Sequence, residues 1–390
     1  MLYQEVVRLN RILVIVLISI LVLSLTLITT CGKKGNEIVI GVAGPFTGDG
    51  AQFGDMIRKG ATMMMEKVNS EGGIDGRMIK LVFEDDKGDP REAALVAQKL
   101  ASDPEVVAVV GHFNSSCSKA AKPIYKQMRI VELSPGSTNK DVCIGSEWTF
   151  RDVYRDDFQG YAIADYIHDI LGKKRVAIFY DNDDYGRGLM EFFVERAKEL
   201  GMEIVRMEAY TRDTQEFTPQ LTNIKKENPE IIFISGLYTQ AAMICAQARR
   251  LGIDIPFMGG DGLMSSDLIK IGGDAVEGIV ITCPFIPEMA GEGGEEFVSA
   301  FEKKYGEPPD AWAALTYDAV GIIVKAIKEV GTDREKIKDY LATMTTTEKG
   351  YKGVTGTTVF DENGDCIKPL FVATVVNGEF IPAEKQFETE

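Results

Sequence analysis

Residues 106–138, VVAVVGHFNSSCSKAAKPIYKQMRIVELSPGST, combine a strand, a hydroxyl-rich loop and a helix in one run. The five apolar residues at its start have the length and β-branched content of a strand inside a parallel sheet. Ser115 and Ser116 precede apolar residues at helical spacing, so we expect them at a helix N-terminus, where unpaired N–H groups can hold an anion. A second strand, residues 130–133, ends in the hydroxyl-rich loop 134–138. Either loop alone could simply cap a helix, but the two together predict a ligand crevice in an open α/β sheet.

The composition indicates a well-buried globular protein of two or three domains, because the chain has 390 residues and 45% of them are apolar. The net charge is −16, and no cluster of Lys and Arg is interleaved with aromatic residues. The composition therefore argues against a nucleic-acid partner. Only two histidines are present and no Cys-x-x-Cys occurs, so we expect no metal site.

Residues 1–30 have the pattern of a secretory signal peptide. Two arginines precede an uncharged apolar run over residues 12–28, and Ile-Thr-Thr-Cys31 follows. This ending resembles a bacterial lipobox, which predicts lipidation of Cys31 and a membrane anchor, with residues 31–36 as a tether. The apolar run is also at the lower limit of a membrane span, so an uncleaved anchor is the alternative. In both cases the body of the protein lies in the cell envelope, outside the cytoplasmic membrane.

The other five cysteines are expected to be buried free thiols, because their number is odd and most lie within apolar runs. At most one pair, such as Cys117 with Cys143, remains open as a disulfide. The remaining three are Cys245, Cys283 and Cys366.

Strands and helices alternate in two series along the chain, which predicts parallel sheets with right-handed crossovers. The first series starts at residue 38, and the second runs from near Asp156 to Cys283. Three helical segments follow between residues 295 and 344, and then short strands, for which Asn363-Gly364 is the predicted hairpin turn. We expect two α/β lobes whose strand-end loops face each other.

Seven short motifs resemble, in order and spacing, the branched-chain amino-acid type of periplasmic binding protein. They are GPFTGDGAQFG at residues 44–54, GGIDGR at 72–77, DDKGDP at 85–90, GHFNSS at 111–116, YGRG at 185–188, FTPQL at 217–221 and FMGGDG at 257–262. The resemblance implies an α/β clamshell, the type I periplasmic binding fold, with two Rossmann-like, three-layer lobes whose parallel sheets are joined by crossover strands. It assigns residues 37–156 plus 286–365 to lobe 1 and residues 157–285 plus 366–390 to lobe 2.

The resemblance also implies how lobe 1 holds a ligand. Ser115 and Thr138 match residues that bind the α-carboxylate and α-ammonium of an amino acid, together with backbone groups of Ser115 and Gly136. Ser116 belongs to the same loop. Hydroxyls and helix-terminal N–H groups facing a carboxylate in the other lobe would offer opposite charges to the two ends of an amino acid.

In lobe 2, Tyr185 matches a tyrosine that reaches across the cleft, and Asp261 matches a carboxylate, commonly Glu, that pairs with the ammonium. Asp261 is one methylene shorter than Glu, which can change the ligand. The residues implied around the ligand side chain are Phe53, Phe113, Leu237 and Tyr238.

One departure from the family pattern is the absence of a disulfide beside the binding loop, since Gly88 and Asn114 stand where some members have cysteines. The ligand side chain also stays open, because relatives of this type bind amino acids, amides, urea or aromatic acids.

The sequence predicts an extracytoplasmic solute-binding lipoprotein that delivers a small amino acid, of branched-chain type, to an ABC permease, as a monomer without a cofactor. The alternatives are a binding protein for an amide, urea or an aromatic acid, and a sensor ectodomain. An enzyme is disfavoured, because residues 48–54 miss the GxGxxG pattern by one place and His112 has no evident acid partner for a triad. We therefore expect no catalytic residues.

Overall fold

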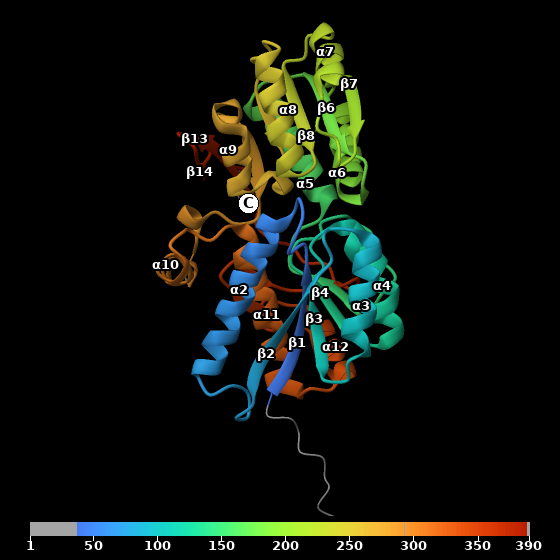
Figure 1. The fold of residues 1–390 in the computed structure, drawn as a ribbon, viewed down its shortest axis with the longest axis vertical. Coiled ribbons are helices and arrows are strands. Elements are labelled where there is room, and N and C mark those ends of the chain that lie inside the picture. Colours follow the sequence, from blue (N-terminus) through green and yellow to red (C-terminus); the bar gives the residue numbers. More distant parts are fainter. Residues whose placement is uncertain (1–36, 292, 388–390) are drawn as a thin grey trace, which may run out of the picture.

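The computed structural model describes residues 37–291 and 293–387 and shows two lobes, each built around one β-sheet. In Figure 1 the blue and teal lobe 1 lies below the green and yellow lobe 2. The predicted signal peptide, tether and lipidation site at Cys31 lie outside the described residues.

The sheet of lobe 1 has five parallel strands in the order β2-β1-β3-β4-β5. These strands are β1 (Glu37–Gly44), β2 (Met78–Asp85), β3 (Val106–Val110), β4 (Val131–Ser134) and β5 (Thr149–Arg151). All residues of β3 are buried, as expected for a strand covered on both faces. Because the strands are parallel, the loops after β3 and β4 emerge at the same edge of the sheet.

Five helices cover this sheet, and two of them come from late in the sequence. They are α2 (Ala51–Ser70), α3 (Pro90–Ser102), α4 (Ser115–Met128), α11 (Ala311–Val330) and α12 (Arg334–Ala342). Helix α11 packs against α2, and a Cβ on Gly60 would lie only 2.2 Å from the Ala313 carbonyl oxygen, so the close approach requires glycine. The Asp310 side chain caps α11 by accepting from the N–H groups of Trp312 and Ala313 at 2.9 Å each.

The sheet of lobe 2 has seven strands in the order β14-β13-β10-β9-β8-β6-β7, with β13 and β14 antiparallel to their neighbours. Its strands are β6 (Arg175–Asp181), β7 (Glu203–Tyr210), β8 (Ile231–Ser235), β9 (Phe257–Gly259), β10 (Val280–Cys283), β13 (Phe371–Val376) and β14 (Glu379–Pro382). The helices of this region are α5 (Asp156–Asp165), continued by the π-turn Tyr166–Ile170, then α6 (Asp184–Glu199), α7 (Thr218–Lys226), α8 (Tyr238–Arg250), the 3-10 turn Asp261–Leu263 and α9 (Ser266–Gly272).

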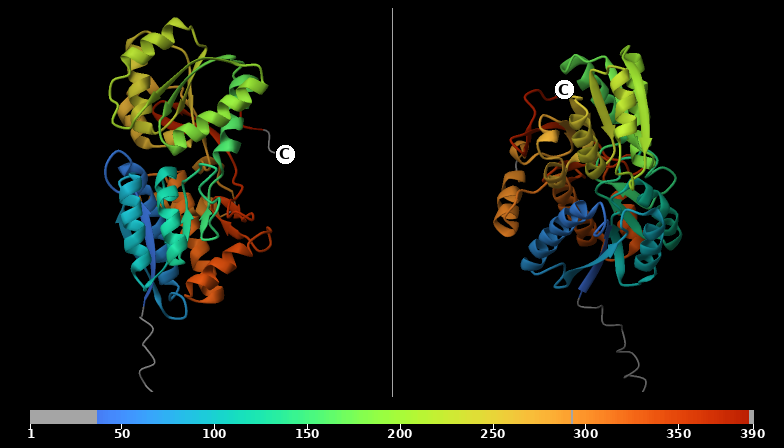
Figure 2. Two further views of the ribbon diagram at one scale, coloured as in Figure 1. Left: turned by 90° about the vertical axis from the view of Figure 1, so that its right-hand side faces the viewer. Right: turned by 45° about the horizontal axis from the view of Figure 1, so that its top comes forward.

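The chain passes between the two sheets three times: after β5, after β10, and again before β13. The last two passages enclose α10 (Gly294–Tyr305), α11, α12 and the small hairpin of β11 (Tyr351–Gly353) and β12 (Gly356–Thr358). The turned views in Figure 2 show the orange and red segments rejoining lobe 1 before the last strands return to lobe 2. On this basis we propose residues 37–156 plus 286–365 as lobe 1, and 157–285 plus 366–390 as lobe 2, of which residues 292 and 388–390 lie outside the described residues.

The predicted hairpin turn at Asn363-Gly364 is wrong. The hairpin forms at Asn377-Gly378, between β13 and β14, where φ is 53° and 76° and Val376 pairs with Glu379. Gly364 instead lies in a loop, and its carbonyl oxygen accepts from the backbone N–H of Arg151 at 3.0 Å. The dipeptide Asn-Gly therefore has different roles at the two positions, and only Asn377-Gly378 connects two paired strands.

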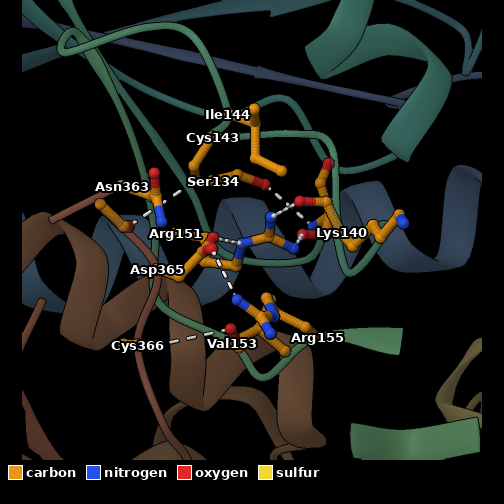
Figure 3. Close-up of polar contacts among 12 residues, drawn as sticks. Ser134, Lys140, Cys143, Ile144, Arg151, Val153, Arg155, Asn363, Asp365 and Cys366 are labelled. Carbon is orange, nitrogen blue, oxygen red and sulfur yellow. Dashed lines mark hydrogen bonds and ion pairs between the residues drawn. The ribbon is translucent and has the colours of Figure 1, made fainter. Parts of the chain in front are cut away.

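Buried ion pairs connect the first and third passages between the lobes (Figure 3). Asp365 accepts from Arg151 Nε at 2.6 Å and from Arg155 Nη1 at 3.2 Å. Nearby, Lys368 Nζ lies 2.9 Å from Asp152 Oδ1, and both side chains are fully buried. We call these five residues the hinge cluster.

The five described cysteines are all buried and free, so the open question of a bridge between Cys117 and Cys143 is answered in the negative. Two of them make weak contacts near the hinge cluster, Cys143 to the Gly364 carbonyl oxygen at 3.7 Å and Cys366 to that of Val153 at 3.6 Å.

Candidate ligand-binding site

A cavity lies between the lobes, at the carboxyl ends of strands from both sheets. Its empty space amounts to about 260 Å³, a figure that includes the part open to solvent. Its walls are formed by Phe113, Asn114, Ser115, Gly136, Tyr185, Leu237, Asp261, Gly262 and Trp312. Six of these residues were predicted from the sequence: Phe113, Ser115, Gly136, Tyr185, Leu237 and Asp261.

The lobe 1 wall is the N-terminus of α4 together with the loop after β4. Ser115 is the first residue of α4, as predicted, and its hydroxyl oxygen accepts from the Asn139 N–H at 3.2 Å. A Cβ on Gly136 would lie 2.3 Å from the Phe113 ring, so glycine is required for the two loops to meet. Helix-terminal N–H groups and a hydroxyl at this wall suit an anion.

The carbonyl oxygen of His112 holds these two loops together. It accepts hydrogen bonds from the hydroxyls of Ser134 at 2.6 Å and of Ser118 and Ser137 at 3.3 Å each. The serines of the predicted loops therefore have two different roles. These three hold the two loops together, while Ser115 lines the cavity.

The His112 ring does have an acid partner, contrary to the sequence interpretation. Its Nδ1 lies 2.6 Å from Asp86 Oδ2, while its Nε2 lies 3.0 Å from the Tyr125 hydroxyl. The ring is fully buried and neither nitrogen faces a serine, so this group fixes the loop and forms no catalytic triad.

The lobe 2 wall presents a buried carboxylate. Asp261 is only 1% exposed, and its Oδ1 accepts from the Tyr185 hydroxyl at 2.8 Å, while its Oδ2 has no hydrogen-bond partner. Burial raises the pKa of Asp261 to about 6, although the hydrogen bond from Tyr185 opposes this shift. An unpaired oxygen on a buried acid is unfavourable unless a ligand supplies the donor.

Aromatic rings form the third wall. The Phe53 ring lies 4.6 Å from that of Phe113, 4.8 Å from that of Tyr238 and 5.9 Å from that of Trp312, measured between centroids. Phe53 is fully buried, so it and Tyr238 support the wall from behind rather than lining the cavity. This wall suits an apolar side chain.

The lobes contact each other around the cavity. Asp184 at the start of α6 accepts from Lys119 Nζ at 2.8 Å and donates its N–H to the Ser116 hydroxyl oxygen at 3.2 Å. The Tyr238 hydroxyl donates to the Asp49 carbonyl oxygen at 2.6 Å. Ser116, predicted as a ligand residue, therefore forms a hydrogen bond between the lobes and does not line the cavity. Thr138 is buried behind the cavity wall, and its hydroxyl has no partner.

Three cavity residues were not predicted: Asn114, Gly262 and Trp312. Asn114 and Gly262 each adjoin a predicted residue in the sequence, so the motifs GHFNSS and FMGGDG contained the signal. Trp312 lies in the first turn of α11, and its indole N–H donates to the Met264 carbonyl oxygen at 3.1 Å. Its local pattern is that of a buried helix, so only the return of the chain to lobe 1 brings it to the cavity.

Within the part of the chain that the structure describes, no group of three or more His, Cys, Asp or Glu side chains could hold a metal ion. Over the same residues, no helix has both the length and the apolar character needed to cross a membrane.

Two lobes with mostly parallel sheets and a cavity at their strand ends define a solute-binding clamshell. The family described as periplasmic binding protein matches residues 37–379, so the chain belongs to this family. It is 31% identical to the leucine-, isoleucine-, valine-, threonine-, and alanine-binding protein of Pseudomonas aeruginosa, over 85% of this chain and 87% of that protein.

Solved structures agree. The leucine binding protein LivK from Thermotoga maritima superposes with a TM-score of 0.84 at 34% identity, covering 89% of this chain and 97% of that chain. The substrate binding protein LivJ from Streptococcus pneumoniae, in complex with isoleucine, also gives a TM-score of 0.84, at 31% identity over 90% of this chain and 98% of that chain. These findings confirm the predicted fold class and resemblance, and the family and these relatives are solute-binding proteins rather than enzymes.

The two positions where some members carry cysteines lie together in this structure. A Cβ on Gly88 would be 3.0 Å from Asn114 Oδ1. The loop beside the cavity is thus packed by an amide side chain in place of a bridge.

Proposed function

We propose that this protein captures a free α-amino acid with an aliphatic side chain of branched-chain type. The observation that carries the proposal is the opposition of the two walls: a hydroxyl and helix N-terminus at Ser115 face the buried carboxylate of Asp261 across one small cavity. A zwitterion satisfies both walls at once, whereas a simple acid or amide leaves Asp261 without its cation. The aromatic wall and the named ligands of the relatives support an aliphatic side chain.

A thermal-shift screen of the amino acids, with urea, amides and aromatic acids, tests the proposal. A true ligand raises the melting temperature in a concentration-dependent way, because it stabilises the folded state by RT ln(1 + [L]/Kd). The expected result is a shift with leucine, isoleucine or valine. A shift with benzoate or an amide and none with any amino acid would refute it and favour the corresponding alternative ligand.

We further propose that the loaded protein delivers its ligand to an ABC permease and is held at the membrane by a lipid on Cys31. The apolar run that ends in Ile-Thr-Thr-Cys31 supports the anchor. Mass spectrometry of the native N-terminus should find a lipidated Cys31. An intact Met1 would leave the uncleaved anchor as the better description.

The proposed mode of action is that of a monomer whose lobes close on the ligand. The contacts of Lys119 with Asp184 and of Tyr238 with Asp49 support it, since a ligand shifts an open and closed balance only through contacts made in one state. Small-angle scattering should show a smaller radius of gyration with ligand. An unchanged radius despite saturation would contradict closure.

A further inference from the structure

A second carboxylate, which the sequence did not single out, lies beside the Asp261 wall. Asp156 is the first residue of α5 and is fully buried, and neither of its carboxyl oxygens makes a hydrogen bond of normal geometry, although the Thr138 hydroxyl lies close enough to lower its pKa. Its backbone N–H donates to the Thr138 carbonyl oxygen at 2.8 Å, so it adjoins the predicted ligand threonine. A buried carboxyl group without such a hydrogen bond is rare in folded proteins and calls for a missing donor.

Among the described residues, no Lys, Arg or His forms an ion pair with this carboxylate. The charged groups that face it are Asp261, Arg151 and Asp183. Arg151 is already committed, since its Nε donates to Asp365 at 2.6 Å and its Nη1 to the Ser137 carbonyl oxygen at 3.0 Å.

The neighbouring phenols of Tyr154 and Tyr185 are neutral, because burial and the charge of Asp261 raise the pKa of each well above its ordinary value. Burial, and next the negative charge of Asp261, likewise raise the pKa of Asp156 well above its ordinary value, while the Thr138 hydroxyl and Arg151 oppose the shift.

We propose that Asp156 is a second carboxylate of the ammonium site, protonated in the empty cleft and ionised when the ligand's ammonium group enters. This inference rests on the amino-acid function proposed above. A primary ammonium carries three N–H donors. The buried acceptors on the Asp261 side of the cleft that lack a hydrogen bond of normal geometry include both carboxyl oxygens of Asp156, Thr138 Oγ1, Gln159 Oε1 and Asp261 Oδ2, enough to receive all three.

The space around Asp156 also fits this role. A Cβ on Gly188 of α6 would lie 3.4 Å from Asp156 Oδ2 and only 2.6 Å from Asn139 Nδ2, so the glycine keeps the surroundings of the carboxyl group clear. On binding, the Asp156 O–H bond breaks, its proton leaves to the solvent, and the ammonium replaces it as the partner of the carboxylate. The net charge around Asp156 is therefore unchanged, because the ligand's ammonium group replaces the proton.

Calorimetry in two buffers of different ionisation enthalpy, slightly above neutral pH, measures the proton. Wild-type protein with its best amino acid should release close to one proton per ligand, since Asp261, with a pKa of about 6, is already ionised there. Asp156→Asn should bind about tenfold more weakly or worse and release no proton. Its melting temperature without ligand should be equal or higher, because a buried acid has been removed; a purely structural residue would instead lower it.

Glu132→Gln is the matched control, because Glu132 is another fully buried acid whose pKa is raised, to about 7, by burial. It should keep the affinity and proton release of the wild type. If the amino acid binds without proton release, or if Asp156→Asn binds and releases as the wild type does, Asp156 is no part of the site while the proposed function stands. If no amino acid binds the wild type, both proposals are refuted.

Discussion

The molecule has two regions of buried charge, and they differ in how their carboxylates are paired. In the hinge cluster, Asp365 contacts two arginines and Asp152 contacts Lys368. In the cleft, no Lys, Arg or His of the described residues forms an ion pair with Asp156 or Asp261. Burial is the same in the two regions, so burial alone does not distinguish them.

This difference in pairing distinguishes carboxylates that can bind a ligand from carboxylates that stabilise the fold. A buried charge that the fold has paired stabilises one arrangement of the chain, and removing its partner is strongly unfavourable. A buried acid that the fold leaves unpaired raises the energy of the empty protein and can be relieved by a ligand. The unpaired acids of the cleft therefore fit the proposed binding of a ligand cation, and the paired ones join the segments that connect the lobes.

The largest expected effect is on the hinge cluster. Lys368→Met should lower the free energy of unfolding at neutral pH by about 3–5 kcal/mol, because it leaves Asp152 buried without a cation. Urea denaturation measures it, and the loss should shrink in acid, where Asp152 takes up a proton. Lys270→Met is the control, since the Lys270 to Asp267 pair is exposed and worth about 1 kcal/mol or less. Equal effects of the two changes would remove the contrast between buried and exposed pairs.

Next comes the cleft itself. Asp261→Ala should weaken binding by on the order of 3 kcal/mol, about a hundredfold, because the ammonium would lose the carboxylate that is already ionised in the empty cleft at neutral pH. The fold should be unaffected, since no cation depends on Asp261. Calorimetry with the amino acid and with its deaminated analogue checks this. An analogue that binds the wild type as tightly as the amino acid does would show that the ligand is not held as a zwitterion.

A smaller effect is expected at the anion wall. Ser115→Ala removes one hydroxyl and should weaken binding by roughly 1–3 kcal/mol, because the helix-terminal N–H groups still face the carboxylate. Ser116→Ala should have less effect on affinity, since the Ser116 hydroxyl bonds Asp184 and does not line the cavity. Titration of both variants settles the order, and a greater loss for Ser116→Ala would mean that Ser116, rather than Ser115, binds the ligand.

The smallest effect is the dependence on pH. Asp261, with a pKa of about 6, must be ionised to hold the ammonium, so below that value its protonation should weaken binding by about a further tenfold per pH unit, in addition to the loss linked to the proton of Asp156. The stability of the empty protein should change in the opposite sense. Because the folded pKa is raised, this group favours the folded state more as the pH falls from about 6 towards its unfolded value. Affinity that stays constant down to pH 5 would contradict an ionised Asp261.

The strands and helices could be predicted from apolar runs and helical spacing, and six cavity residues from the family resemblance that the short motifs carry. Trp312 and Asp156 could not, since each lies in a helix whose pattern is ordinary and reaches the cleft only through the passages between the lobes. The hairpin error has the same origin. Asn363-Gly364 and Asn377-Gly378 are identical in sequence, and only the strand pairing around the second decides which one turns. Local chemistry predicts elements, whereas long-range topology decides which elements share a site.

The hinge cluster has a further consequence for motion. When one rigid body swings about an axis, each atom is displaced in proportion to its lever arm. The link of Arg151 and Arg155 to Asp365 ties two of the three connecting segments together, so in the proposed closure it can persist while the lobes swing. The contact of Tyr238 with Asp49 joins the lobes themselves instead, so it must break for the cleft to open. The connections between the lobes are thus of two kinds, those that a swing leaves intact and those that it makes and breaks.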